Sequence, residues 1–248
     1  MKERNMEKYK KTGFSLIELA AVILIIAFLI SSISIAYSMI KQASLRSIIS
    51  EANTFTDAIN LFEQKYRSLP GDFPYASVQW GTACDSTPSN CNGNGDGVIE
   101  YSYSSLSQNE ALRAWQHLSL AGMIIGSYTG VTDLAGTTYI GVNAPMAQYN
   151  KKGWSFQNEV RYSHLEQYLE IGGPRLGFPP NDSILPTIDA YSIDNKIDDG
   201  YPRNGLVWGA TIYGFPGGCY FPDTTTAPYT TDATNGSCIL EFTFRKNR

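Results

Sequence analysis

A long apolar run near the N-terminus constrains this chain more than any other feature. Residues 19–30 (LAAVILIIAFLI) contain no polar side chain, and Glu18 is the one charged residue in the wider stretch 14–40. As a helix, that stretch would be about 40 Å long, against a hydrocarbon core of about 30 Å. We therefore predict a single transmembrane helix over residues 14–40, with the remaining chain folded on one side of the membrane.

Charge is distributed unevenly on the two sides of this run. Residues 1–13 hold five basic and two acidic side chains, a net charge of +3, whereas the whole chain carries −4. Because basic flanks stay in the cytoplasm, residues after 40 should lie in the periplasm of a single-pass inner-membrane protein. Residues 14–248 carry a net charge of −7 without a basic stripe, which argues against a nucleic-acid partner.

An ordinary secretory signal peptide or a plain membrane anchor would explain the same apolar run. Such a signal ends in small residues at a cleavage site, and Ser34 and Ala36 can be fitted to that pattern. The helical pattern, however, continues past residue 36 without a break. This alternative stays open at this point.

The junction at residues 10–18 reads KKTGFSLIE. It resembles the type IV prepilin signature, in which a basic leader and a glycine precede Phe-Ser-Leu-Ile-Glu and an apolar helix; the likeness covers residues 8–36. The resemblance implies that a prepilin peptidase cuts between Gly13 and Phe14 and methylates the new amine of Phe14. It implies a subunit of a type IV pilus or a type II secretion pseudopilus, assembled with other pilin-like subunits on an inner-membrane platform.

Glu18 would be the fifth residue of the mature chain. An ionised carboxylate in an apolar helix costs on the order of 3 kcal/mol near the bilayer centre, so such a residue persists where it finds a partner. The Phe14 amine of a packed neighbour is one such partner, and a polar pair in an apolar seam sets axial register. The alternative is that Glu18 reaches the headgroups by itself.

An apolar stripe follows over residues 41–69, with spacings of three and four. This spacing predicts an amphipathic helix that packs on a sheet, in preference to a coiled coil, and Pro70 and Gly71 end it. The chain then divides into a leader (1–13), a transmembrane and assembly helix (14–40), the amphipathic helix (41–69) and a head (70–248). The stripe is formed by Leu45, Ile48, Ala52, Phe55, Ile59, Phe62, Tyr66 and Leu69.

The head should contain one more helix and several strands. Ser107 and Glu110 predict a capping box for a helix over 108–121, which Gly122 closes. The last strand, 238–244, alternates apolar and polar residues and should be half buried. The fold class is therefore α+β, a long helical spine on an antiparallel sheet as in pilins. Extended segments are predicted at 137–142, 154–162, 167–171, 205–213 and 238–244.

Four cysteines occur as two local pairs, Cys84 with Cys91 and Cys219 with Cys238. In an oxidising compartment they predict two short disulfide loops, although three pairings are possible. A zinc site is disfavoured, because neither pair has CxxC spacing and the chain has two histidines. The second pair also resembles the C-terminal disulfide loop of type IV pilins.

Residues 92–103 follow part of the EF-hand pattern. Oxygens stand at the first, third and fifth positions and a glycine at the sixth, but Tyr103 replaces the final glutamate. The pattern predicts weak Ca²⁺ binding, with a Kd on the order of 10⁻⁴ M, unless Asp85 or another residue adds an oxygen. A tight Asn-Gly turn is the alternative. The predicted ligands are Asn92, Asn94, Asp96, the Val98 carbonyl and Glu100.

A second acidic cluster comprises Asp194, Asp198 and Asp199. Thr187 could cap a short helix that ends near Ile197, so that two of these carboxylates would oppose the helix dipole. A turn is the favoured explanation and a cation the alternative. Calcium sites of this sort recur in type II secretion pseudopilins, so the resemblance adds support for a cation both at this cluster and at residues 92–103.

No enzyme motif stands out. GxSxG, HExxH and P-loop patterns are absent, and two histidines leave little for acid–base work, so we predict a non-enzyme without a cofactor other than Ca²⁺. A tethered hydrolase is the weaker alternative. A membrane-anchored carbohydrate- or surface-binding protein is another, if Trp80, Trp154 and Trp208 are exposed, although core positions are favoured for them. His117 is read as an ordinary surface or satisfied histidine.

Overall fold

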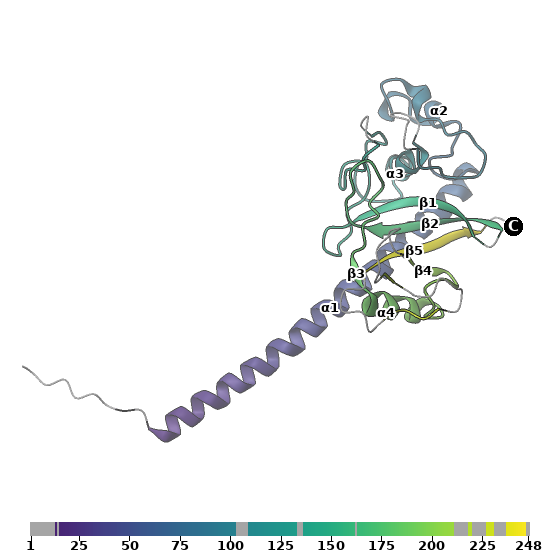
Figure 1. Cartoon of the computed structure of the whole chain (residues 1–248). Helices are drawn as coiled ribbons and strands as arrows, with labels where there is room; N and C mark the ends of the chain where they lie inside the picture. The colour runs from purple at the N-terminus through teal and green to yellow at the C-terminus, as the bar shows by residue number, and fades with distance from the viewer. Residues whose placement is uncertain are drawn as a thin grey trace, which may run out of the picture. The chain divides into compact units, whose positions relative to one another are not determined.

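The computed structural model describes residues 13, 15–102, 109–132, 136–161, 163–210, 218–219, 227–230 and 237–246. The chain divides into two units, Met1–Ala43 and Ser44–Arg248. The first helix, α1 (Leu16–Tyr66), begins in the first unit and ends in the second (Figure 1).

In the first unit, α1 is apolar and exposed along its length. Within the described residues, α1 is the one helix long and apolar enough to cross a membrane. The hydroxyls of Ser31 and Ser32 donate to the carbonyls of Ala27 and Phe28 one turn earlier, so these polar groups are satisfied within the helix. A helix near the N-terminus with these properties fits a single-pass membrane protein, and a signal sequence would look the same.

In the second unit, the predicted stripe of α1 packs into the core. Ile48, Ile59 and Phe62 are fully buried, and the Phe55 ring meets the Trp154 ring edge-on at 5.6 Å. The stripe therefore packs on the sheet, as predicted. The helix ends at Tyr66, three residues before the predicted end, because Arg67 adopts a left-handed φ of 59°.

The sheet is antiparallel, with strand order β1-β2-β5-β3 and β4 also paired to β5 (Figure 1). A long helix and an antiparallel sheet make the fold α+β. The predicted segments 154–162, 167–171 and 238–244 correspond to strands, and 205–213 corresponds in part. The segment 137–142 is not a strand, because it turns at Gly141 and forms a single bridge at Ile140. The strands are β1 (Gly153–Arg161), β2 (His164–Gly172), β3 (Leu185–Pro186), β4 (Val207–Ala210) and β5 (Ser237–Lys246).

The two faces of the sheet differ in chemistry. The inner face carries apolar side chains that pack on α1 and α3 (Glu110–Leu120), as in the 4.3 Å ring contact between Trp115 and Phe156. The outer face carries mostly polar side chains, yet Ile239 and Glu241 on it are each only 4% exposed. The prediction of a half-buried last strand was therefore wrong, since both faces of β5 are buried there.

Helix α3 starts two residues later than predicted and uses a different cap. The Asn109 side chain accepts a hydrogen bond from the Leu112 amide, while the Glu110 carboxylate bonds outside the helix. The predicted capping box was thus wrong for Glu110, and Ser107 lies outside the described residues. Gly122, at a φ of 71°, closes the helix as expected.

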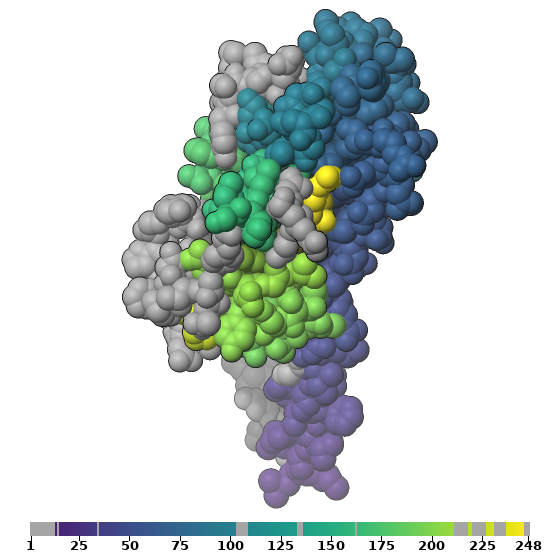
Figure 2. Space-filling model, turned by 90° about the vertical axis from the view of Figure 1, so that its right-hand side faces the viewer, coloured from purple at the N-terminus to yellow at the C-terminus, as the bar shows by residue number. Residues whose placement is uncertain are grey.

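The remaining helices are short. Figure 2 shows the segment around α4 in light green at the surface of the head. Thr187 was predicted to cap α4, but it is the first helical residue, Pro186 holds the cap position, and the Thr187 hydroxyl has no hydrogen-bond partner. These helices are α2 (Ala76–Trp80), η1 (Gly81–Ala83), η2 (Pro88–Cys91) and α4 (Thr187–Ile197).

Candidate functional site

The predicted processing site lies at the start of α1. Gly13 is described, whereas Phe14 lies outside the described residues. The Ser15 hydroxyl accepts from the Ile17 amide at 3.4 Å, and a Glu18 carboxylate oxygen accepts from the Ser15 amide at 2.9 Å. Ser15 and Glu18 therefore form a reciprocal capping box. Sequence reasoning missed it, although the Ser-x-x-Glu spacing was visible.

This cap bears on how an apolar helix tolerates Glu18. The carboxylate satisfies one of the amides that a helix N-terminus leaves without an intrahelical partner, and negative charge is favoured at that end. Glu18 is exposed in its own unit, so an approaching ammonium group could still reach it. The pairing of Glu18 with a neighbour's amine stays a prediction.

Both predicted disulfides are present. Cys84 is bonded to Cys91 and Cys219 to Cys238, with Cα separations of 6.2 and 5.0 Å. Cysteines bonded in this way cannot ligate zinc. The pairing fits an oxidising compartment for the head.

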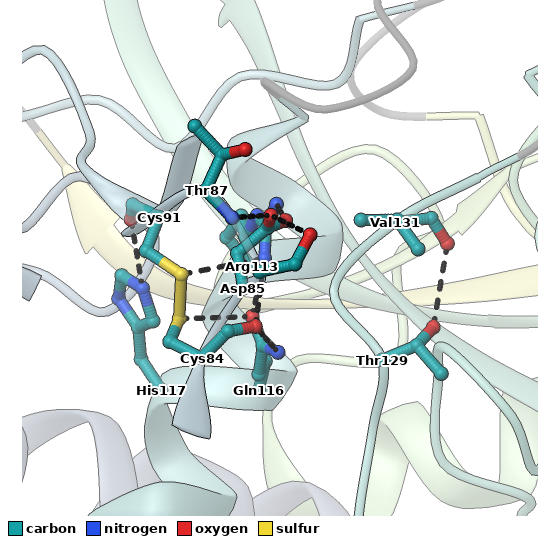
Figure 3. Close-up of polar contacts among 10 residues, drawn as sticks. Cys84, Asp85, Thr87, Cys91, Arg113, Gln116, His117, Thr129 and Val131 are labelled. Atoms are coloured by element: carbon teal, nitrogen blue, oxygen red, sulfur yellow. Dashed lines mark hydrogen bonds and ion pairs between the residues drawn. A yellow bond between two sulfur atoms is a disulfide. The ribbon is translucent and has the colours of Figure 1, made fainter. Parts of the chain in front are cut away.

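Three side chains of α3 surround the first disulfide (Figure 3). The Arg113 guanidinium donates to Asp85 at 2.6 Å, and the Gln116 amide donates to the Cys84 carbonyl at 2.7 Å. Burial would raise the pKa of Asp85, but hydrogen bonds from Arg113 and from the Thr87 amide hold it below its usual value. Asp85 is thus an ion-pair partner of Arg113, and its part in a calcium site stays a prediction.

His117 is the third of these side chains and is fully buried. Its Nδ1 accepts from the Gly71 amide at 2.9 Å, and its Nε2 donates to the Cys91 carbonyl at 3.1 Å. Burial first, then the charge of Arg113, lowers the pKa of His117 to about 3. It is therefore a neutral, satisfied histidine that joins α3 to two loops, as the sequence reading allowed.

The predicted EF-hand-like loop is organised around a buried carboxylate that the sequence did not single out. Asp72 accepts hydrogen bonds from the amides of Gly95, Asp96 and Gly97, at 2.6, 3.0 and 2.9 Å. Glu110 accepts from the amides of Asn94 and Glu100. The backbone of this loop thus presents donors to two carboxylates.

The predicted calcium ligands serve the same turn. The Asn92 side-chain oxygen accepts from the Ser77 amide, that of Asn94 from the Asp96 amide, and that of Asp96 from the Val98 amide. The Asn94 and Asp96 bonds are the Asx turns of the turn alternative, whereas the Asn92 bond joins this loop to α2. Glu100 is exposed. Tyr103 lies outside the described residues. Calcium binding here remains a prediction, and the geometry favours the turn.

Burial also affects the two carboxylates that hold this loop. Desolvation, reinforced by the nearby charges of Asp72 and Asp96, raises the pKa of Glu110 to about 7 in spite of its two amide donors. The pKa of Asp72 is raised as well, again mainly by burial. The loop is therefore held by Glu110, whose pKa lies near neutral pH, and by Asp72, whose pKa burial raises.

The second acidic cluster does come together. Ligand oxygens of Asp194, Asp198 and Asp199 all lie within 4.8 Å of one another, at the C-terminal end of α4. Oxygen donors at this spacing suit a hard divalent cation. Burial first, then the neighbouring carboxylates, raises the pKa of Asp194 to about 7, against hydrogen bonds from Tyr229 and Gly200.

The protein also supplies hydrogen bonds to each member of this cluster. Asp194 accepts from the Tyr229 hydroxyl at 2.7 Å, and Asp198 accepts from the amides of Leu206 and Val207. Asp199 accepts from the Tyr201 amide and the Asn204 side chain. A structural turn therefore explains the cluster, and these carboxylates could also bind a cation.

The three tryptophans do not form an exposed platform. Trp154 is fully buried and Trp208 nearly so, while Trp80 is half-buried against Phe62 and Tyr66. The core positions favoured from the sequence are thus confirmed for Trp154 and Trp208. The sequence suggested a carbohydrate-binding surface only if these tryptophans were exposed, and none of the three is fully exposed.

Comparison with known proteins returned no match to a protein-family model, to a curated protein or to a solved structure.

Proposed function

We propose that this chain is a membrane-anchored filament subunit, of the kind that builds a type IV pilus or a type II secretion pseudopilus. One observation carries the proposal: a Gly13–Phe14 junction after a basic leader directly precedes an apolar helix with Glu18 near its start. In this proposal a prepilin peptidase removes residues 1–13, and the mature helix packs among those of other pilin-like subunits on an inner-membrane platform.

Three features of the described residues support the proposal. α1 continues from its apolar part into a stripe that packs on an antiparallel sheet. Two disulfides suit a head exported to the periplasm, whether the filament ends there or extends outside the cell. Glu18 caps α1 and is exposed, so one carboxylate can serve its own helix and a neighbour's amine.

A resident Ca²⁺ is proposed at the Asp194 cluster in preference to residues 92–100. The cluster offers three carboxylates, whereas the amides of the earlier loop converge on Asp72 and Glu110. In either case the ion would be structural, and we propose no catalytic activity.

An assembly assay with Glu18 variants tests this function. The full chain is co-expressed with a prepilin peptidase, platform and assembly ATPase, and filaments are sheared and quantified. Glu18→Ala should be processed normally but not assembled, because the polar pair is lost. Asp57→Ala, which changes an exposed carboxylate in the same helix, is the matched control and should assemble. Wild-type assembly by Glu18→Ala would contradict the proposal.

A further inference from the structure

The outer face of the sheet holds a buried group of charges that the proposed function does not use. Three adjacent strands contribute four carboxylates and one guanidinium to it. Of the carboxylates, the Glu159 side chain is 56% exposed and can be hydrated, whereas the other three are buried. The group comprises Glu159 and Arg161 on β1, Glu166 and Glu170 on β2, and Glu241 on β5.

Arg161 is held in one place by rings and carboxylates together. Its guanidinium lies 4.4 Å from the Tyr168 ring centroid and 4.2 Å from that of Trp208. The guanidinium donates to Glu241 through Nη2 and to Glu159 through Nε. Its Nη1 lies 3.9 Å from a Glu166 oxygen and has no hydrogen-bond partner. All three guanidinium nitrogens are thus directed at carboxylates other than Glu170.

Glu170 faces Glu241 directly across the β2–β5 pairing. It is buried, and its recorded hydrogen bond is a long one, from the Ser155 hydroxyl at 3.5 Å. In the part of the chain that the structure describes, Glu170 forms no salt bridge. Two buried carboxylates side by side, with one guanidinium bound to one of them, cannot both stay ionised without a large electrostatic penalty.

Among the described residues, Glu170 and Glu241 do not belong to a cluster of metal ligands. In this part of the chain, the Asp194 cluster is the one group of three or more His, Cys, Asp or Glu side chains whose ligand atoms are close enough to hold a metal ion. A proton is the remaining neutralising species, because it converts one carboxylate into a hydrogen-bond donor for the other.

We propose that Glu170 and Glu241 hold a proton in the folded head, and that this pair is a pH-sensitive clamp between β2 and β5. Loss of the proton places two negative charges against each other in the middle of the sheet, so the clamp weakens as the pH rises. This inference concerns the head by itself and does not depend on filament assembly.

The electrostatics of the surrounding groups agree with the geometry. Burial first, and then the charge of Glu241, raises the pKa of Glu170 well above its usual value, against Ser155 and Arg161. Burial also raises the pKa of Glu241, although Arg161 opposes it. The other ionisable groups near the pair are Glu159, Glu166 and Tyr168. The Arg203 guanidinium lies 5.9 Å from the centroid of the Trp208 ring.

The sign of the pH effect follows from these raised pKa values. The folded state keeps a proton that the unfolded chain releases above about pH 4.5, so stability is present below that pH and is lost as the pH rises toward the folded pKa. One extra bound proton corresponds to a tenfold change in the folding equilibrium constant per pH unit.

The test compares unfolding of the full chain in detergent at pH 5 and pH 7 for wild type, Glu170→Gln and Glu159→Gln. In wild type, release of this proton should lower the folding equilibrium constant about hundredfold between pH 5 and pH 7. Because glutamine mimics the protonated acid, Glu170→Gln should lack that hundredfold fall. Glu159→Gln, at the exposed rim, should keep the wild-type loss. An unchanged pH dependence in Glu170→Gln would overturn the proposal.

A second measurement applies to wild type alone and so does not depend on a variant that folds. The carboxyl ¹³C shifts of Glu170 and Glu241, assigned from the backbone, report protonation at each site. At pH 7 one of the two carbons should show the shift of a protonated acid. Ionised shifts for both at pH 6 would overturn the proposal.

Discussion

Replacement of His117 tests how α3 is joined to the loops around it. Both ring nitrogens are used, one by the Gly71 amide and the other by the Cys91 carbonyl, in a fully buried position. His117→Gln can keep the donor near the Nε2 position but loses the acceptor for Gly71, and His117→Asn does the reverse. His117→Leu loses both bonds with little change in volume.

The expected losses follow from the groups left without partners. Each buried amide or carbonyl without a hydrogen bond destabilises by about 1–3 kcal/mol. The single-bond variants should thus lose about 1–3 kcal/mol and His117→Leu about 2–6 kcal/mol. For a unit of this size, 1 kcal/mol corresponds to roughly 2–4 °C in Tm, so thermal unfolding at pH 7.5 should separate the variants.

The pH dependence of stability below pH 6.5 is an independent check on the role of His117. Because the folded pKa of His117 is lowered to about 3 from an ordinary 6.5, its contribution is present above pH 6.5 and is lost as the pH falls below that value. The full span corresponds to about 5 kcal/mol. All three variants should lack this loss. The reasoning fails if His117→Leu matches wild type in Tm or keeps the same acid dependence.

Three further predictions concern other parts of the second unit. Glu51→Ala should destabilise by about 1–3 kcal/mol by thermal unfolding, because the carboxylate accepts from Gln148 and the Trp154 indole; an unchanged Tm would contradict this. Replacing Cys219 and Cys238 by serine opens a loop of 19 residues and should destabilise the protein by about 3 kcal/mol. The same change at Cys84 and Cys91, which close 7 residues, should cost about 2 kcal/mol, and equal losses would contradict the dependence on loop length. Millimolar Ca²⁺ should raise the Tm of wild type and of Asp96→Asn but not of Asp198→Asn, since the ion is proposed at the second cluster; a calcium response lost only in Asp96→Asn would place it in the first loop.

Local patterns in the sequence predicted much of this fold. The stripe from Leu45 to Tyr66, the end of α3 at Gly122 and the strands near residues 154 and 238 all depend on spacing over a few residues. The two cysteine pairs were local as well. Such features are set by periodicity and turn chemistry, which a single sequence displays directly.

Contacts between distant segments were not visible in the sequence. Asp72 lies more than 20 residues before the amides it accepts from, and Arg161 bonds to Glu241 across 80 residues. Alternation alone therefore led to the wrong expectation that one face of β5 meets water. Glu110 was read as a helix cap because nothing local showed that the amides of residues 94 and 100 would need its carboxylate.

The N-terminus of the mature protein tests the central claim most directly. The full chain would be expressed with and without a prepilin peptidase, and the product measured by intact mass and N-terminal sequencing. We predict a chain that begins at methylated Phe14 when the peptidase is present and an uncut chain when it is absent. A product uncut in both cases, or one that begins near residue 36, would contradict the account.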